Sequence, residues 1–197
     1  IDYDIQTKSN KWIGKVFFHH SISPKNNDNA LAHASFIRFN TRKWVFEWNH
    51  EYVGKNYNAE TGFVPRQFFY DQVRDTTIKL TYWRLEPELQ YNIYPKSKTL
   101  YRISPGIYHS MYTDSVFRPN DLLVRLFTEF EFYNTSSLNF NYTEYYTSLL
   151  FPIDVTGSTL VPLPACPYNY RDATVNFVSN ARKRFTFFAE VTFGSFF

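Results

Sequence analysis

The sequence predicts an all-β fold: an antiparallel up-and-down transmembrane β-barrel, of which residues 1–197 form a fragment without an internal domain boundary. Three observations predict it. Large apolar residues alternate with polar ones over long segments, short and long connections alternate along the chain, and the aromatic content is very high. Aromatic residues make up 21% of the chain, with 16 Tyr and 21 Phe. Such residues favour strands.

The alternation is clearest in the segment LLVRLFTEFEFY at 122–133. Its even-numbered positions include the apolar residues Leu126 and Phe130, and its odd-numbered positions include the charged residues Arg125, Glu129 and Glu131. Successive side chains of a strand point to opposite faces, so this strand has one apolar and one polar face. The segments WVFEWNHEY and WRLEPELQYNIY repeat the pattern.

Ten strand segments follow one another without a convincing helix. They are 1–7, 12–23, 30–41, 44–54, 78–94, 99–113, 122–133, 138–151, 172–180 and 185–197. Most reach the roughly 9–11 residues that a tilted membrane-spanning strand needs, whereas a soluble strand averages about 5–6. We therefore expect the apolar side chains to face lipid and the polar ones to face a lumen.

The connections support the same fold. The short ones are 8–11, 42–43, 95–98, 134–137 and 181–184, and the long ones are 24–29, 54–77, 114–121 and 152–171. In an up-and-down meander successive connections lie at opposite ends, so one end has tight turns and the other has loops. Outer-membrane barrels have this asymmetry, with short turns in the periplasm and longer loops outside the cell. Greek-key crossings would break it.

Aromatic residues gather near the expected strand ends, where interfacial belts of a barrel lie. Those beside short turns are Trp12, Trp44, Tyr94 and Tyr101, and those toward the loops are Tyr52, Tyr82, Trp83, Tyr112 and Phe151. The alternative is a large soluble β-sandwich with an aromatic core.

Four segments carry a resemblance to a known family. WVFEWNHEYVGKNYNAETGFVPR at 44–66 and WRLEP at 83–87, together with NKWIGKVFFHHSISP and RKRFTFFAEVTFG, resemble the C-terminal barrel region of Bacteroidota envelope proteins. Those proteins also have an N-terminal domain similar to carbohydrate-binding family 9, which this sequence lacks. The resemblance implies the bacterial outer membrane, with its lipid and lipopolysaccharide as partners. It implies little about activity.

The loop at 54–77 contains the most specific part of this resemblance. Its motif residues are Asn56, Tyr57, Asn58, Gly62, Phe63, Pro65 and Arg66. Residues that favour turns alternate there with large apolar side chains. A connection of this length without a packing role is unusual. The loop either folds inward, as a plug or a partner-binding element with Arg66 held by acidic lumen residues, or extends the hairpin above the membrane.

Charged residues on the polar faces are expected to line the lumen: Arg84, Glu86, Glu88, Arg102, Arg125, Glu129 and Glu131. Carboxylates two residues apart can also serve acid–base hydrolysis. The main hypothesis is a non-enzymatic channel, or a scaffold in a surface complex that handles polymeric nutrients such as glycans. The alternatives are the barrel part of a surface glycan hydrolase and a soluble carbohydrate-binding sandwich.

Other chemistries have weak sequence support. His19 and His20 are adjacent and point to opposite faces, while His33, His50 and His109 lie on different strands without metal-ligand spacing. The single cysteine, Cys166, excludes an internal disulfide. We predict no catalytic residues, no metal and no cofactor. The net charge of +3 gives no reason to expect a nucleic-acid partner.

One hairpin is expected to be irregular. A three-residue loop at 95–97 would place Pro87 opposite Pro105, and a five-residue loop would place it opposite Ile107. Proline has no N–H for the ladder, so we predict a bulge or bend between residues 86 and 107, eased by Gly106 and covered by a protein segment.

Overall fold

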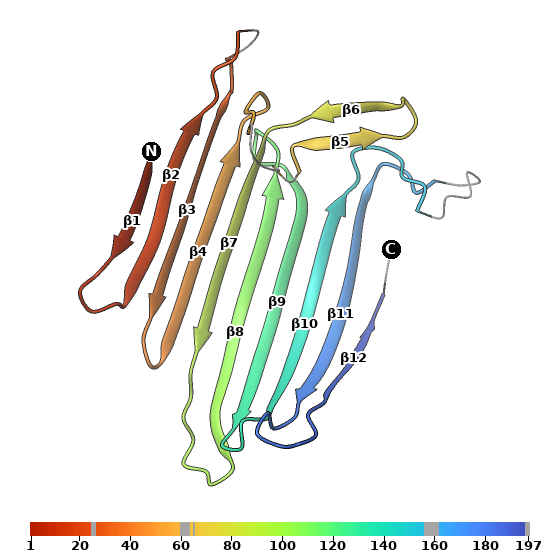
Figure 1. The fold of residues 1–197 in the computed structure, drawn as a ribbon. Coiled ribbons are helices and arrows are strands. Elements are labelled where there is room, and N and C mark those ends of the chain that lie inside the picture. The colour runs from red at the N-terminus through yellow and green to blue at the C-terminus, as the bar shows by residue number, and fades with distance from the viewer. Residues whose placement is uncertain (25–26, 60–63, 65, 156–161, 196–197) are drawn as a thin grey trace.

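The computed structural model describes residues 1–24, 27–59, 64, 66–155 and 162–195. Ten strands form one antiparallel up-and-down sheet, in the order β1-β2-β3-β4-β7-β8-β9-β10-β11-β12. Figure 1 shows the N-terminal and C-terminal strands at opposite edges of this sheet. The predicted all-β meander is confirmed. No pairing joins β1 to β12 among the described residues, so the sheet is open.

The strands agree closely with the predicted segments. They are β1 (Asp2–Gln6), β2 (Trp12–His20), β3 (Leu31–Asn40), β4 (Trp44–Val53), β7 (Tyr82–Tyr91), β8 (Leu100–Thr113), β9 (Pro119–Phe132), β10 (Ser137–Ser148), β11 (Pro167–Val178) and β12 (Phe188–Gly194). The described residues contain no helix of the length and apolarity that crossing a membrane requires.

A second, small sheet was missed. Strands β5 (Phe68–Asp71) and β6 (Thr76–Lys79) form a hairpin inside the connection between β4 and β7. Figure 1 shows this hairpin beside the loop ends of the long strands. Four-residue strands are too short for an alternation pattern to reveal them. The two long strands on either side still pair directly, with Trp44 opposite Tyr91.

The predicted difference in connection length is only partly right. Strand β9 begins at Pro119, so the connection after β8 is a tight turn at 114–118 rather than a long loop. Asp114 holds this turn by accepting hydrogen bonds from the N–H groups of Val116 and Arg118, at 2.8 and 2.9 Å. Phe117 adopts a left-handed φ of 62° there. The expected short turns at 95–98 and 181–184 instead extend over 92–99 and 179–187.

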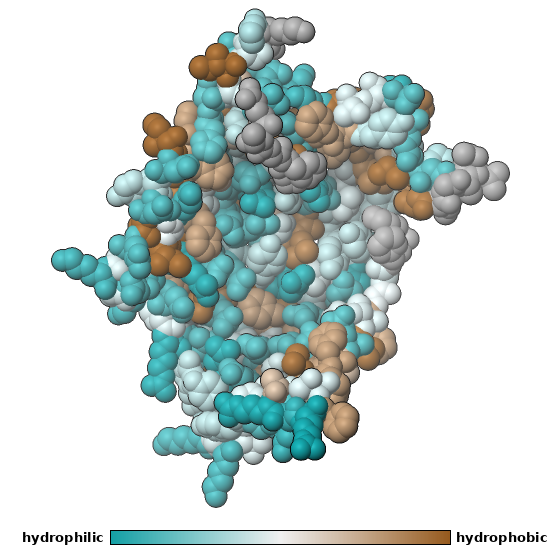
Figure 2. Space-filling view, in the orientation of Figure 1, coloured by the Kyte–Doolittle hydropathy of each residue, from teal (hydrophilic) through white to brown (hydrophobic). Residues whose placement is uncertain are grey.

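The register sorts the side chains onto two faces. One face, called the apolar face, carries Trp48 opposite Pro87, Ile107 opposite Leu126 and Phe130 opposite Leu138. The other, called the polar face, carries Glu47 opposite Glu88 and Arg102 opposite Glu131. The polar face is turned toward the viewer in Figure 2, where its centre is recessed and hydrophilic side chains predominate.

The hairpin of β7 and β8 is interrupted near both prolines. Paired residues stop at Leu85 opposite Met111 and resume at Glu88 opposite Tyr108, which leaves Pro87 outside the ladder. Extending this register places Pro87 opposite His109, so both expected pairings were wrong. The ladder stops again after Gln90 and Gly106, before an isolated bridge between Ile93 and Ile103.

Polar side chains bond to one another beside the second gap. Asn92 is buried, and its amide oxygen accepts hydrogen bonds from Ser104 Oγ and Gln90 Nε2, both at 2.8 Å. Its own backbone N–H donates to the carbonyl of Lys43 at 2.7 Å. The hairpin thus remains joined to β4 where its own ladder fails. A covering protein segment at this place stays a prediction.

Gly106 lies beside the second gap of the β7–β8 ladder, within the range where the irregularity was predicted, and it also has a steric role. The register shifts of β8 against β9 lie at Leu100/Arg102 and Tyr112/Thr113, away from this glycine. A Cβ at Gly106 would lie 2.2 Å from Cζ of Phe127, which is its partner across the strands. The missing side chain therefore makes room for an aromatic ring on the polar face.

Candidate functional site

The polar face gathers all seven charged residues that were predicted to lie together. They are Arg84, Glu86 and Glu88 on β7, Arg102 on β8, and Arg125, Glu129 and Glu131 on β9. The three strands are neighbours in the sheet, and their register places these residues on one face. The alternation within each strand was enough to predict this grouping.

Arginines pair with the carboxylates of this cluster. Arg102 Nη2 lies 3.0 Å from both Glu129 Oε2 and Glu131 Oε2. Arg84 Nη2 lies 3.1 Å from Glu51 Oε2, and its Nε lies 3.7 Å from Glu86 Oε2. Each of these four carboxylates is thus held in place by a neighbouring guanidinium.

Sequence reasoning missed several partners on the neighbouring strands. Glu51 on β4 accepts hydrogen bonds from Arg84 and from the hydroxyl of Tyr82. Arg38 on β3 lies 2.9 Å from Glu47 on β4. The register of β3, β4 and β7 was needed to find these contacts, because no single strand contains both members of a pair.

The described part of the long loop packs against the polar face. Tyr57 and Val64 contact a small buried cluster of Ala32, Val53 and Tyr82. These three residues belong to β3, β4 and β7 and lie on the polar face. Tyr82, expected in an interfacial belt, lies beneath the loop instead. The arrangement matches the alternative in which the loop folds inward.

Gln67 fixes the base of this loop. Its side chain is 1% exposed, and its Nε2 donates to the carbonyl oxygens of Gly54 and Tyr57 at 3.1 and 2.7 Å. The backbone N–H of Leu80 donates to the carbonyl of Gln67 at 2.9 Å, which closes the base of the β5–β6 hairpin. Glutamine in a loop has no sequence signal that would single it out.

Arg66 anchors the loop to an acidic residue. Its guanidinium forms an ion pair with Asp121 at the loop end of β9, and it also lies 4.2 Å from the centre of the Tyr112 ring. Asp121 and Tyr112 are cross-strand partners on the polar face. Tyr112 was another residue expected in an interfacial belt.

The remaining motif residues divide into two groups. Asn56 Nδ2 donates to the carbonyl of Asp28 at 2.7 Å, and the N–H of Asn58 donates to Ser21 Oγ at 3.1 Å. These bonds connect the loop to the β2–β3 connection. Gly62, Phe63 and Pro65 lie outside the described residues.

The apolar face carries the cross-strand pair Glu144 and Arg171, and also a polar cluster on β3 and β4 to which the sequence analysis gave no function. Ser35 Oγ lies 2.6 Å from His50 Nδ1, and His50 Nε2 lies 2.9 Å from His33 Nδ1. The sequence analysis found no metal-ligand spacing among the histidines and did not predict this contact between His33 and His50. The two-residue turn at 42–43 was enough to predict that Ser35 and His50 meet, because a turn of this length places Ser35 opposite His50 across β3 and β4.

This cluster resembles a nucleophile and its base, but the backbone around it argues for a structural role. A reacting serine needs free N–H donors for the oxyanion that forms. Strand β3 is paired with β2 on one side and β4 on the other. The described residues contain no group of three or more His, Cys, Asp or Glu side chains that could hold a metal. The three side chains instead satisfy one another.

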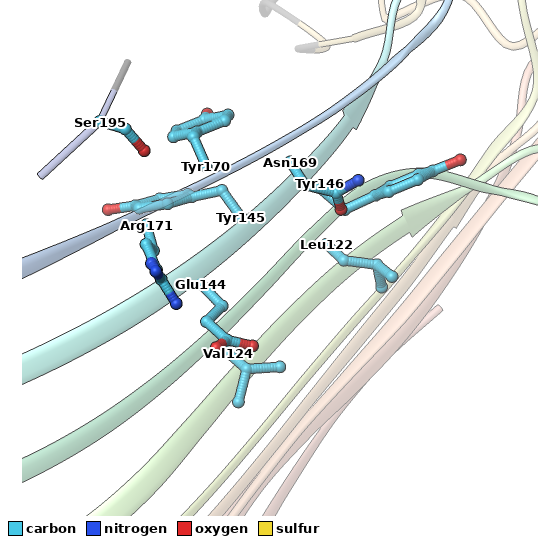
Figure 3. Close-up of a pocket in the computed structure, with 9 residues that line it drawn as sticks. All are labelled: Leu122, Val124, Glu144, Tyr145, Tyr146, Asn169, Tyr170, Arg171 and Ser195. Atoms are coloured by element: carbon cyan, nitrogen blue, oxygen red, sulfur yellow. The ribbon is translucent and has the colours of Figure 1, made fainter. Parts of the chain in front are cut away.

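A pocket of about 440 Å³ lies where β11 extends past the end of β12. Tyr145 and Tyr170 stack at its wall with ring centres 4.6 Å apart, and Figure 3 shows them near Ser195. Glu144 and Arg171 are cross-strand partners that also line it. The pocket is open at the sheet edge and contains no buried charged group that points to a ligand.

Comparisons with protein-family models, with curated proteins and with solved structures gave no match to this chain.

Proposed function

We propose that the ten-stranded sheet forms part of the wall of an outer-membrane β-barrel, a non-enzymatic channel or scaffold. The apolar face contacts lipid, and the polar face lines the lumen. The observation that carries the proposal is the exposure of large apolar side chains in the middle of the strands. Leu89 and Ile107 are each 43% exposed, and Leu126 is 52% exposed.

These side chains form a continuous surface rather than isolated spots. Cross-strand pairing joins Leu89 to Ile107, and Ile107 to Leu126, through three adjacent strands. Soluble monomers rarely expose contiguous apolar patches larger than a few hundred Å². Hydrocarbon is the solvent that suits such a face, because lipid tails are as apolar as the side chains themselves.

The opposite face supports a hydrated lumen. On this face the strands carry more acidic residues than basic ones, and several of the carboxylates take part in none of the described ion pairs. The acidic residues are Asp2, Asp4, Glu47, Glu51, Glu86, Glu88, Asp121, Glu129, Glu131, Asp172 and Glu190, and the basic ones are Lys15, Arg38, Arg84, Arg102 and Arg125. Burying this many charges in a soluble core would cost several kcal/mol per ion.

The location proposed is the bacterial outer membrane, with its lipid and lipopolysaccharide as partners. The end that carries the connections after β1, β3, β7, β9 and β11 would then face the periplasm, and the packed loop would lie toward the cell exterior. From the resemblance to Bacteroidota envelope barrels we also propose a role in the handling of polymeric nutrients, such as glycans, at the cell surface. The loop held by Arg66 and Gln67 would act as a plug or a docking element over the lumen.

All four tryptophans offer a direct test of the lipid face. Trp12, Trp44, Trp48 and Trp83 lie on the apolar face. In the full chain reconstituted into vesicles, a variant that keeps only Trp48 should lose most of its fluorescence when the lipid acyl chains carry bromine. A heavy atom quenches only rings that it contacts.

The matched control moves the ring to the other face. A variant that lacks the four native tryptophans and carries Phe36→Trp has its ring on the polar face, because Phe36 lies opposite Asn49. This variant should be quenched weakly by brominated lipid and strongly by aqueous acrylamide. Equal quenching of both variants would contradict the face assignment, and no quenching of either would favour a soluble sandwich.

Loosening the loop should expose it to protease. In Gln67→Leu the buried amide that holds three loop carbonyls is lost, and each carbonyl left without a donor costs about 1–3 kcal/mol. We expect cleavage within 54–81 to be at least about tenfold faster, since 1.4 kcal/mol is a factor of ten. Arg74→Ala, in the same connection and exposed, serves as the control. Unchanged cleavage in Gln67→Leu would contradict the anchoring role.

A further inference from the structure

Charge is distributed very unevenly between the two ends of the sheet. Five connections, those after β1, β3, β7, β9 and β11, meet at one end, which lies at the bottom of Figure 1. Every charged residue in them is basic. This basic rim consists of Lys8, Lys11, Arg42, Lys43, Lys96, Lys98, Arg182, Lys183 and Arg184. The connections at the other end carry both signs, for example Lys55, Asp71, Arg74 and Asp114.

The basic side chains are available to an outside partner. All of them are exposed, and none forms an ion pair with an acidic residue within the part of the chain that the structure describes. Figure 2 shows hydrophilic side chains projecting from this end. The rim therefore concentrates positive charge that nothing in the described structure neutralises.

Aromatic rings lie directly above the rim on the apolar side. Trp12 packs on Phe39 at 4.7 Å, and Trp44 packs on Tyr91 at 4.5 Å, both between ring centres. The Arg42 guanidinium lies 4.8 Å from the centre of the Tyr94 ring. Tryptophan and tyrosine prefer the level of the lipid headgroups. The next layer outward from them is the layer of headgroup phosphates.

We propose that the basic rim binds anionic phospholipid headgroups of the leaflet at the turn end of the sheet. Lysine and arginine ammonium and guanidinium groups attract phosphate oxygens, and juxtamembrane basic residues gain affinity for anionic lipid surfaces. The neighbouring tryptophans hold the rim at the depth where these phosphates lie. The inference rests on the proposed membrane location and adds a lipid class and an end of the molecule to it.

The experiment uses the full chain in vesicles and a variant that keeps only Trp44, next to the rim. Vesicles contain either brominated phosphatidylglycerol or brominated phosphatidylcholine, each mixed with the other lipid unbrominated. Quenching should be stronger with the brominated anionic lipid, because that lipid is enriched around the ring. A variant that keeps only Trp83, near the loop end, should show a smaller preference.

Neutralising the rim should remove the preference. The double change Arg42→Gln and Lys43→Gln is expected to lower the relative association of phosphatidylglycerol at Trp44 by about 25-fold, since each basic residue near an anionic surface contributes about fivefold. Lys55→Gln with Arg74→Gln, which removes two charges at the other end, should leave it unchanged. Salt should weaken the native preference, because exposed charges are screened.

The possible results separate the two proposals. Equal quenching of Trp44 by both brominated lipids overturns the headgroup inference and leaves the membrane location standing. Failure of both lipids to quench overturns the membrane location itself. A stronger preference for lipid A than for phosphatidylglycerol at Trp44 would overturn the assignment of the rim to the phospholipid leaflet.

Discussion

Replacing Leu126 with arginine should lower the free energy of unfolding in a lipid bilayer by about 2–4 kcal/mol. Leu126 is 52% exposed in the middle of β9, and it has Ile107 and Tyr142 as cross-strand partners. In water such an exposed side chain would tolerate arginine with a change within about 0.5 kcal/mol. In hydrocarbon the guanidinium loses its hydration. The size of the effect therefore reports the solvent of the apolar face.

The measurement is reversible urea unfolding of the chain from lipid vesicles, compared with Asn141→Arg. Asn141 lies next to Leu126 in the sheet but on the polar face, opposite Phe127. Arginine there would lie on the charged polar face and should cost far less. Similar costs for the two variants would contradict the proposed arrangement.

A side chain at Gly106 should also be strongly destabilising, by about 1–3 kcal/mol for Gly106→Val. Three ring atoms of Phe127 lie 2.2 to 2.8 Å from the position of the added Cβ, so the ring must leave its place. Unfolding in urea measures the loss. In a Phe127→Ala background the same change should cost much less, and the double-mutant cycle gives the coupling energy. Costs that simply add would show that the ring is not the obstacle.

The outcome at particular residues shows what the sequence could and could not predict. Strand positions and faces follow from strict alternation, which is why Arg102, Glu129 and Glu131 were grouped correctly. Turn geometry follows less well. The connection after β8 is a tight turn rather than the expected loop, because the Asp114 side chain accepts hydrogen bonds from two of its N–H groups. A single aspartate in the sequence does not indicate how long a connection is.

Contacts between strands needed the register. The pairing of Ser35 with His50 depends on a turn of only two residues, and it could have been worked out from that turn. The pairing of β7 with β8 could not have been worked out in this way. The ladder is interrupted near Pro87 and Pro105, and the sequence does not show at which residues the pairing resumes. Closure into a barrel stays a prediction, since the described sheet ends at β1 and β12.

The order of the strands has a consequence for how the chain folds. Every neighbouring pair in the main sheet is consecutive in sequence except β4 and β7, which the β5–β6 hairpin separates. Hairpins with short connections close quickly, whereas joining β4 to β7 requires residues 54–81 to form a larger loop first, at a greater entropic cost. We therefore expect β1–β4 and β7–β12 to assemble as two separate units.

The step that joins these two units also creates the binding surface for the connecting segment. Tyr57 and Val64 pack on residues from both sides of the junction, namely Ala32 and Val53 on one unit and Tyr82 on the other. The segment can reach its final position only when β4 and β7 have met. The chain's topology thus sets when the segment docks, and we expect the polar face to acquire this cover during assembly rather than afterwards.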